Sequence, residues 1–462
     1  MELNNKKIIN AWGMYDWANS VYSLVITSAI FPVYYNLVTT GEDGSDKVDF
    51  FGLEIVNTVL YSYALSFSFL FVAAILPLLS GMADYSGRKK FFLKIFMYTG
   101  SLSCIGLYFF TGENIEWAII CSVLASIGYS GGLVFYDAFL PEIASEDRFD
   151  RVSAKGYSLG YIGSVILLIV NIVMIENPTW FFNVTVKAQE LASAGVGINE
   201  ATVQAEGHYA TILTRFSFLM VGLWWMGFSQ ITFYILPSNV YARKPTGKLL
   251  TKGYQELLKV WNVVKRMRVM KLFLLAFFFY NMGVQTVMYL AATFGAKELK
   301  LDSASLILTV LIIQLVAIAG AYLFAHISKI RGNKYSLVIM VLIWVFICVG
   351  AYFVTTRYEF FVLAFVVGMV MGGIQSLSRA TFAKLIPKDT LDHASFFSFF
   401  DVAFHLSVVV GTFSYGLIEQ ITNDMRNSVL ALIMFFIVGL GFLLLVKIPF
   451  YKVIKEGAQE RL

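Results

Sequence analysis

Residues 56–79 read VNTVLYSYALSFSFLFVAAILPLL, a stretch without one charged side chain. A bilayer core about 30 Å thick needs roughly 20 apolar residues for each helical crossing. Similar runs recur along the whole chain of 462 residues, of which 58% are hydrophobic and only 14% are charged. A soluble protein has no interior that could bury so many helices that are apolar on every side, and the runs are too long for the strands of a membrane barrel. The sequence therefore predicts a helical protein that crosses a membrane many times.

Twelve such runs, separated by polar segments with Gly, Pro and charged residues, predict twelve transmembrane helices. The first run carries Asp16 and Asn19 and has no cleavage site of small residues, so we interpret it as a permanent helix rather than a signal peptide. The expected fold class is an all-α polytopic membrane protein. The predicted helices cover residues 10–38, 56–79, 91–110, 116–137, 153–175, 213–236, 272–295, 303–327, 335–355, 359–380, 395–418 and 427–448.

The 35 lysine and arginine residues are unevenly divided between the two sides of these helices. Most lie on the side of the N-terminus, and cytoplasmic segments are the ones that collect positive charge. We therefore expect both termini in the cytoplasm and the protein in the cell membrane. The basic residues then act as topology anchors near the lipid headgroups, so the formal net charge of +5 does not indicate a nucleic-acid partner.

The chain also repeats itself weakly, at an offset of about 245 residues. GRK at residues 87–89 follows the second predicted helix, and GNK at 332–334 follows the eighth. Pro141 follows the fourth helix and Pro387 follows the tenth. Each half thus holds six helices and starts on the same side of the membrane, which predicts two parallel six-helix halves.

This repeat divides the chain into four predicted parts. They are an N-terminal half (1–236), a cytoplasmic linker (237–271), a C-terminal half (272–450) and a cytoplasmic tail (451–462). The linker is basic and compatible with a helix over residues 254–268, so we expect it to lie along the membrane surface.

The loop after the second helix reads SGMADYSGRKK (residues 80–90). It resembles the loop signature of the major facilitator superfamily, in which an aspartate is followed by Gly-Arg-Lys. The resemblance implies that Asp84, Gly87, Arg88 and Lys89 form a conformational gate that bridges helices on the cytoplasmic side and holds the outward-facing state. Electrostatics agrees, because the N-terminus of a helix elsewhere in the bundle would attract the Asp84 carboxylate. The alternative is a tight turn whose basic residues only anchor the topology.

Four further segments narrow the resemblance to one branch of that superfamily. They read WGMYDWANS (12–20), IFP (30–32), YDAFLPEIA (136–144) and SAKGYSLGYIG (153–163). Together they look like the branch that contains the autophagy-related vacuolar amino-acid effluxers and their bacterial relatives. The resemblance implies the major facilitator fold and, as substrate, an amino acid or a similarly small polar metabolite.

The eleventh predicted helix departs from that branch. Relatives are expected to carry something like Gly-Lys-Phe followed by Gly-Pro, whereas this chain has FHL at 404–406 and GT at 411–412. A permanent cation is replaced by a titratable imidazole, and the helix-kinking proline is absent. The mechanism of the branch is therefore not carried over to this helix.

Polar side chains inside the predicted helices are costly in lipid and are therefore candidates for function. Asp16, Asn19, Ser20, Ser23 and Thr27 share one face of the first helix, which must then face the interior of the bundle. We interpret this stripe as part of the substrate path. The alternatives are hydrogen bonds to a neighbouring helix and, for Asp16, an ion pair with an arginine of the gate.

Asp401 and His405 lie one turn apart in the eleventh helix. A carboxylate stabilises an imidazolium, and histidine can change its charge near neutral pH. These two residues and Asp16 are therefore our candidates for proton coupling, with a purely structural histidine as the alternative. Neutral side chains in other helices are candidates for substrate binding, or else for hydrogen bonds between helices: Tyr157, Tyr161, Asn281, Gln285, Gln314 and Gln375.

These features predict a secondary active transporter that moves a small polar solute by alternating access and is coupled to protons. A transporter-like membrane receptor or scaffold is the alternative. The chain has no G-x-x-x-x-G-K-[ST] motif for ATP, and its four histidines form no metal-binding or catalytic pattern. We therefore expect neither an enzyme nor a metal or other cofactor. The expected partners are the solute and the lipid bilayer, without nucleic acid, and the protein is expected to work as a monomer.

Overall fold

The computed structural model describes residues 2–41, 44–239, 242, 243, 245, 247–422 and 424–447, so the predicted tail (451–462) lies outside the described residues. Eleven of the described helices are long and apolar enough to cross a membrane. A further helix of 19 residues, α4 (Lys89–Leu107), is about 28 Å long at about 1.5 Å per residue and packs against two of them. The prediction of an all-α polytopic membrane fold is confirmed, and the helix count is consistent with twelve.

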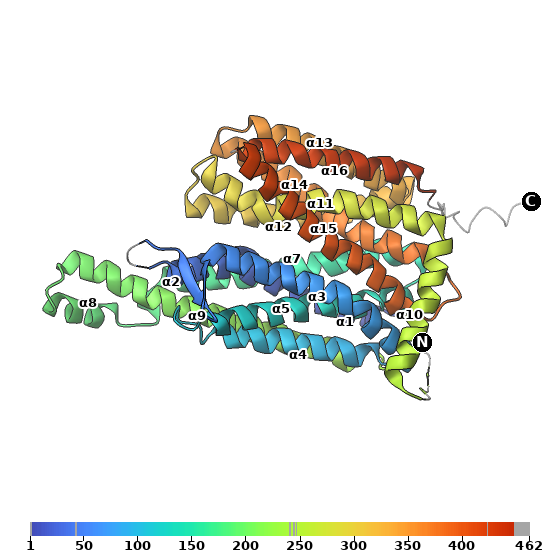
Figure 1. Cartoon of the computed structure of the whole chain (residues 1–462), viewed down its shortest axis with the longest axis horizontal. Helices are drawn as coiled ribbons and strands as arrows, with labels where there is room; N and C mark the ends of the chain where they lie inside the picture. Colours follow the sequence, from blue (N-terminus) through green and yellow to red (C-terminus); the bar gives the residue numbers. More distant parts are fainter. Residues whose placement is uncertain are drawn as a thin grey trace, which may run out of the picture.

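One bundle contains the helices of the N-terminal part of the chain (Figure 1). Two short 3-10 turns, Glu146–Arg148 and Pro178–Trp180, accompany them. The helices are α1 (Lys6–Val21), the π-helical η1 (Tyr22–Ala29), α2 (Phe31–Thr39), α3 (Asn57–Ser86), α4, α5 (Ile115–Asp137), α6 (Leu140–Ile143), α7 (Phe149–Glu176), α8 (Val184–Ser193) and α9 (Ile198–Ile235).

A second bundle contains the helices of the C-terminal part, and α10 (Leu249–Arg266) crosses one end of both bundles (Figure 1). We call this end, which also carries the N-terminus, the α10 end. The helices of the second bundle are α11 (Arg268–Lys297), α12 (Ser303–Arg331), α13 (Asn333–Phe353), α14 (Arg357–Leu385), α15 (His393–Thr422) and α16 (Met425–Leu445).

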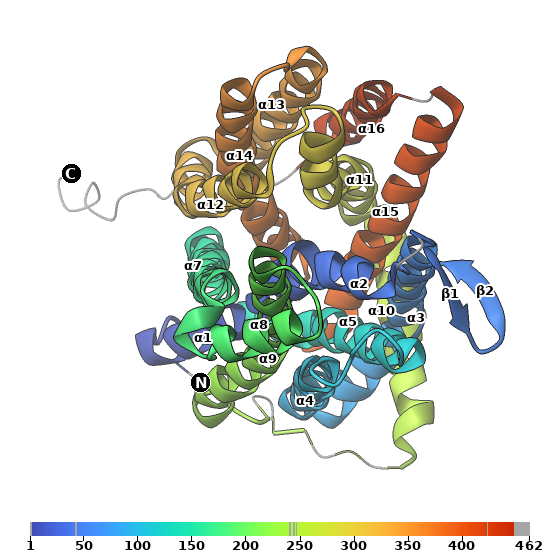
Figure 2. The same cartoon turned by 90° about the vertical axis from the view of Figure 1, so that its left-hand side faces the viewer.

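The opposite end carries a small antiparallel hairpin that the sequence pattern did not predict. Its strands are β1 (Lys47–Phe50) and β2 (Leu53–Val56), with Lys47 opposite Val56. We call this end the hairpin end; Figure 2 looks onto it and shows the two bundles side by side, with the hairpin at the rim beside α3. The helix α8 packs on α9 at this end; α8 and the first part of α9 lie in the segment expected to be a long loop between two predicted helices.

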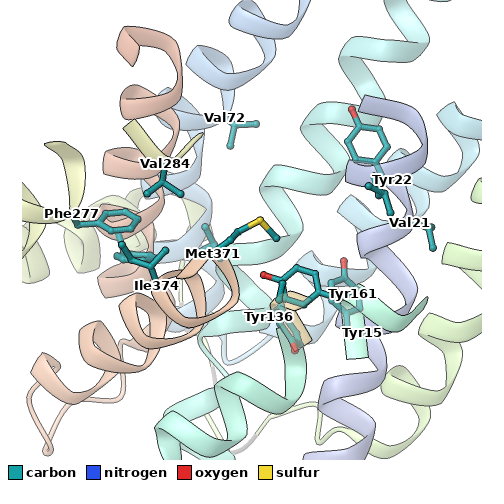
Figure 3. Packing of buried hydrophobic residues seen from close by; sticks show 14 of the residues in the cluster. Tyr15, Val21, Tyr22, Val72, Tyr136, Tyr161, Phe277, Val284, Met371 and Ile374 are labelled. Carbon is teal, nitrogen blue, oxygen red and sulfur yellow. The ribbon is translucent and has the colours of Figure 1, made fainter. Parts of the chain in front are cut away.

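The two bundles contact each other mainly through α3 with α15 and through α7 with α12 and α14. Large buried side chains from both bundles meet at the centre (Figure 3). Tyr136 and Tyr161 come from one bundle and Met371 and Phe277 from the other. This arrangement leaves the space between the bundles lined by α1, α5 and α7 on one side and by α11, α14 and α15 on the other.

Candidate functional site

A cavity lies between the two bundles and offers about 170 Å³ of room to water-sized molecules. It is lined by residues of α1, η1, α3, α5 and α7 and by residues of α11, α12, α14 and α15. Most of the candidate residues named from the sequence lie in its wall. They are Asp16, Ser20, Ser23, Thr27, Tyr157, Tyr161, Gln285, Gln314, Gln375, Asp401 and His405.

Two candidates, Asn19 and Asn281, do not line the cavity. Asn19 is buried, and its nearest polar contact is the Ser20 hydroxyl, 3.5 Å from Asn19 Oδ1. The Asn281 amide donates to Ser407 Oγ at 2.6 Å and so ties α11 to α15. Asn281 thus has the alternative role, a hydrogen bond between helices, and its carbonyl oxygen also orients Gln285 at 3.2 Å.

Part of the wall contributed by the first predicted helix is π-helical. The Ile30 N–H bonds to the Val25 carbonyl five residues back at 2.8 Å, and Pro32 has no N–H for the preceding turn. π-Helical turns are rare and occur mostly at functional sites. Here the segment η1 places Ser23 and Thr27 in the cavity wall.

A buried arginine, Arg379 on α14, closes the cavity toward the α10 end and is only 1% exposed. Its guanidinium lies 2.9 Å from Asp137 Oδ1 on α5 and 3.4 Å from Asp16 Oδ2 on α1. It also donates to the hydroxyl and the carbonyl of Ser153 on α7, at 2.9 and 3.0 Å. One side chain of the second bundle thereby joins three helices of the first.

Aromatic rings enclose this charged cluster. The guanidinium carbon of Arg379 lies 4.3 Å from the centre of the Tyr157 ring and 4.9 Å from that of Trp12. The Tyr136 hydroxyl donates to Asp16 Oδ2 at 2.7 Å. Planar stacking combined with forked ion pairing is typical of the guanidinium of arginine, whereas the ammonium group of lysine is neither planar nor forked.

Sequence reasoning did not identify Arg379 or Asp137. Each was predicted at the end of a helix, where a charged residue normally faces the lipid headgroups. In the structure α14 continues to Leu385, so Arg379 lies inside the helix. The alternative for Asp16 was an ion pair with an arginine of the gate; an ion pair does form, but its partner is Arg379 of α14 and not Arg88.

At the α10 end, Asp84 joins the C-terminus of α3 to the N-terminus of α15. Its carboxylate accepts from the backbone N–H of Ser395 at 2.6 Å and of Ala394 at 3.2 Å. An N-terminus exposes unpaired N–H groups and a partial positive charge, so it binds a carboxylate well. This is the geometry expected for Asp84 from electrostatics.

The other gate residues of this loop, Gly87, Arg88 and Lys89, differ in their contacts. Lys89 forms an ion pair with Glu142 and lies 3.9 Å from Asp84, and His393 at the start of α15 lies 3.3 Å from Glu142. Gly87 ends α3 with a φ of +68°, a conformation that suits glycine. Arg88, expected in the gate, is instead exposed and makes no side-chain hydrogen bond or ion pair with the described residues.

A second set of polar contacts joins the bundles beside this loop, centred on Asp150 in the first turn of α7. Lys384 of α14 lies 2.7 Å from Asp150 Oδ2, and Ser328 and Asn333 donate to its two oxygens at 2.8 Å each. Asn333 belongs to the repeat of the Gly-Arg-Lys loop in the second half of the sequence. Both copies of the repeated loop therefore take part in closing the α10 end.

Arg243, which precedes α10, and Lys259, which lies in α10, fasten the segment around α10 to both bundles, and Asp392 before α15 binds both of them. Arg243 lies 2.9 Å from Asp392 Oδ1, and Lys259 lies 2.9 Å from Oδ2. Arg243 also donates to the backbone carbonyl of Asp84. Burial alone would raise the pKa of the Asp392 carboxyl, but the hydrogen bonds and charges of Lys259 and Arg243 hold it below its ordinary value.

We expect Asp392→Asn to release this segment, so that backbone amides over residues 247–266 exchange several-fold faster with deuterium at pH 7. Because the pKa of Asp392 is lower in the folded than in the unfolded state, its contribution to stability is present above the unfolded value of about 3.9. It is lost only as the pH falls through the lower folded value, so protection should be constant from pH 5 to pH 8. Asp389→Asn, an exposed neighbour, is the control and should exchange as wild type. Equal exchange in both variants would contradict the fastening role.

Asp401 and His405 line the cavity from α15, and both are buried, at 5% and 1% exposure. No hydrogen bond or ion pair joins them to each other or to another described residue. The His405 ring stacks on Phe69 of α3, with ring centres 5.5 Å apart. The expected Asp401–His405 pair thus shares one helix face without direct contact.

One family model and several known proteins match most of this chain. Residues 4–149 and 145–450 match the family described as vacuole effluxer Atg22 like. The uncharacterized MFS-type transporter YxiO of Bacillus subtilis is 31% identical over 435 residues, which cover 94% of this chain and 93% of the relative. Autophagy-related protein 22 of Kluyveromyces lactis is 23% identical over 419 residues, which cover 82% and 77% of the two chains.

Solved structures share the fold at much lower identity. The major facilitator transporter FucP in the outward conformation has a TM-score of 0.68 at 11% identity, with 96% of this chain and 98% of FucP covered. The proton:xylose symporter XylE also has a TM-score of 0.68, at 13% identity, with 96% and 95% covered. At these identities the likeness shows the fold alone.

Proposed function

Because the chain belongs to the vacuole effluxer Atg22-like branch of the major facilitator superfamily, we propose that this multi-pass membrane transporter moves a small polar solute by alternating access, coupled to protons. The solute is an amino acid or a similar metabolite. The protein resides in the cell membrane with both termini in the cytoplasm, so the α10 end is the cytoplasmic end. The N-terminal half (1–236) and the C-terminal half (272–450) move relative to each other around the linker.

One observation carries this proposal: a polar cavity lies between two bundles that are joined at one end by ion pairs. Asp84, Asp150 and Arg379 each bind partners from the opposite bundle. Contacts of this kind can break and re-form as a unit, which is what a two-state gate needs. The contacts of Asp84 and Asp150 lie at the α10 end, which supports the state that is closed to the cytoplasm.

The side chains in the cavity wall support the proposal that the solute is small and polar. Hydroxyl groups of Ser20, Ser23, Tyr157 and Tyr161 face amide groups across the space, and both kinds of group donate and accept hydrogen bonds. The opposite amides belong to Gln285, Gln314 and Gln375. The Tyr161 hydroxyl lies 2.7 Å from Gln375 Oε1, a bond between the bundles that a bound solute can replace.

Proton coupling is assigned to Asp16, Asp401 and His405. Two of them, Asp401 and His405, form no hydrogen bond or ion pair with the described residues, and an unpaired ionisable group in a membrane is a candidate functional site. Asp16 lies in the ion-pair cluster of Arg379, where a change of its charge would act directly on the contact between the bundles.

Transport by the purified protein in proteoliposomes tests the proposal. We expect uptake of at least one radiolabelled amino acid by counterflow, and a change in its rate when a pH gradient is imposed. Asp84→Asn and wild type should bind the same solute, because Asp84 lies outside the cavity wall. Binding without counterflow or uptake under any pH gradient would favour the receptor alternative.

A further inference from the structure

The charges in the cavity wall do not balance. Among the described residues, the wall contains three carboxyl groups, on Asp16, Asp137 and Asp401, and one permanently charged cation, Arg379; the imidazole of His405 is the other basic group. Asp16 and Asp137 both lie against Arg379, so this cluster carries one negative charge in excess when both are ionised. Asp401 adds a second when it is ionised. A cavity with such a surplus attracts positively charged solutes and repels anions.

Arg379 is not available to bind an anionic solute. A guanidinium has five N–H groups, and Arg379 makes five hydrogen bonds to Asp16, Asp137 and Ser153. A solute carboxylate could bind there only by breaking contacts that join the two bundles. The cavity therefore has one cation in its wall and no free donor on it.

Several unpartnered polar atoms of the wall are acceptors. Within the described part of the chain, Asp401 Oδ2 and Gln314 Oε1 have no hydrogen-bond partner, and neither has either ring nitrogen of His405. A carboxylate and an amide oxygen only accept hydrogen bonds, and a neutral imidazole offers one acceptor nitrogen. Buried acceptors without partners are costly, so they require a ligand that donates.

Aromatic rings complete the wall around these acceptors. Phe69, Phe400 and Phe404 line the same cavity, and Phe400 and Phe404 flank Asp401 in the sequence of α15. The faces of aromatic rings attract cations, and they do so more strongly where water is excluded. An acidic group, neutral acceptors and ring faces together form a receptor for an ammonium group.

We propose that the cavity binds its solute through a protonated amino group held against Asp401, and so accepts cationic and zwitterionic amines and rejects net anions. This inference rests on the proposed function and narrows its solute class. The Asp401 carboxylate can bind the ammonium group only after it has lost its proton. The proton and the ammonium group therefore bind to Asp401 alternately. The charged groups that face Asp401 across the cavity are Asp137 and Arg379, with His405 on its own helix.

A series of matched probes tests this selectivity on the purified full-length protein. L-leucine carries both charged groups, isopentylamine lacks the carboxylate, and 4-methylpentanoate lacks the ammonium group; L-lysine and L-glutamate extend the series to net cations and net anions. Binding is read as the rise of the thermal unfolding midpoint with probe concentration. We expect the amines to raise the midpoint, and 4-methylpentanoate and L-glutamate to leave it unchanged.

Asp401→Asn keeps the shape of the side chain and removes its charge, so it should weaken amine binding at least tenfold. Asp401→Glu, which keeps the charge, should retain measurable binding. Glu54→Gln in the exposed hairpin removes the same charge far from the cavity and serves as the control. The probe series on the wild-type protein needs no variant, so it decides the proposal even where Asp401→Asn does not fold.

Preferred binding of 4-methylpentanoate or L-glutamate overturns the inference, and so does the absence of binding by every amine. Unchanged amine affinity in Asp401→Asn also overturns it. Counterflow of the same probes separates the two proposals. Amines that bind but never cross the membrane uphold the amine receptor and refute transport, whereas transport of an anion upholds transport and refutes the amine receptor.

Discussion

Arg379→Ala is expected to abolish transport and to destabilise the folded protein by about 3–5 kcal/mol, the cost of removing one partner from a buried ion pair. The substitution leaves the buried carboxyl groups of Asp16 and Asp137 without the cation that lies against both. It also removes the hydrogen bonds to Ser153 and the guanidinium that stacks on the ring of Tyr157. Thermal unfolding in detergent and counterflow in proteoliposomes measure the two effects.

Arg357→Ala is the matched control for this prediction. Arg357 lies on the same helix, α14, but is exposed at its first turn, and such substitutions change stability by about 0.5 kcal/mol or less. Arg379→Lys should fail almost as badly as Arg379→Ala, because an ammonium group cannot make the forked contacts to three helices. A transport-competent Arg379→Ala variant of wild-type stability would refute the role assigned to the cluster.

Asp84→Asn is expected to shift the population toward the state that is open at the α10 end. The substitution removes the charge that binds the N-terminus of α15 through two backbone N–H groups. A hydrogen bond to a charged group contributes about 1.5–3 kcal/mol, and about 1.4 kcal/mol corresponds to a tenfold change in population. The open state should therefore become at least tenfold more populated.

Alkylation of a buried cysteine between the bundles measures this shift. Ala154 packs with Ala321 and Ala325 between α7 and α12, so Ala154→Cys should react only when the α10 end opens. The background replaces Cys104, Cys121 and Cys348, which are also buried. Asp84→Asn should raise the alkylation rate about tenfold, and Asp147→Asn, an exposed control at the same end, should not. Equal rates in the two variants would show that Asp84 does not hold the gate.

The helices could be predicted because a membrane leaves the chain few alternatives. An apolar run in lipid must satisfy its backbone internally, so residues 56–79 and their counterparts had to be helical. The partner of Asp84 followed from its charge and the helix dipole. The extension of α3 to Ser86, of α9 back to Ile198 and of α14 to Leu385 did not follow, since helices continue past the bilayer into regions whose composition is not apolar.

The centre of the site could be predicted only in part. The spacing of polar residues shows which of them share a helix face, but it does not show how deeply each one is buried. The stripe of Asp16, Ser20 and Ser23 was found from spacing alone, and these residues line the cavity. In the sequence, Arg379 resembles the basic residues that anchor a helix end at the lipid headgroups. Only the packing of α14 against α7 shows that it is buried. The π-helical segment η1 and the β1–β2 hairpin depend on local geometry that hydrophobic patterning does not encode.

Alternating access around the cavity is the central claim, and paired distance measurements test it most directly. Spin labels at Asp147→Cys and Asp389→Cys, both exposed at the α10 end, report the separation of the two bundles there. Labels at Glu113→Cys and Arg357→Cys, exposed in the loop before α5 and at the start of α14, report the hairpin end. We expect two distance populations at each end of the protein. In Asp84→Asn, the population with the longer α10-end distance and the shorter hairpin-end distance should increase. A single unchanged distance at both ends, in wild type and in Asp84→Asn, would contradict this claim.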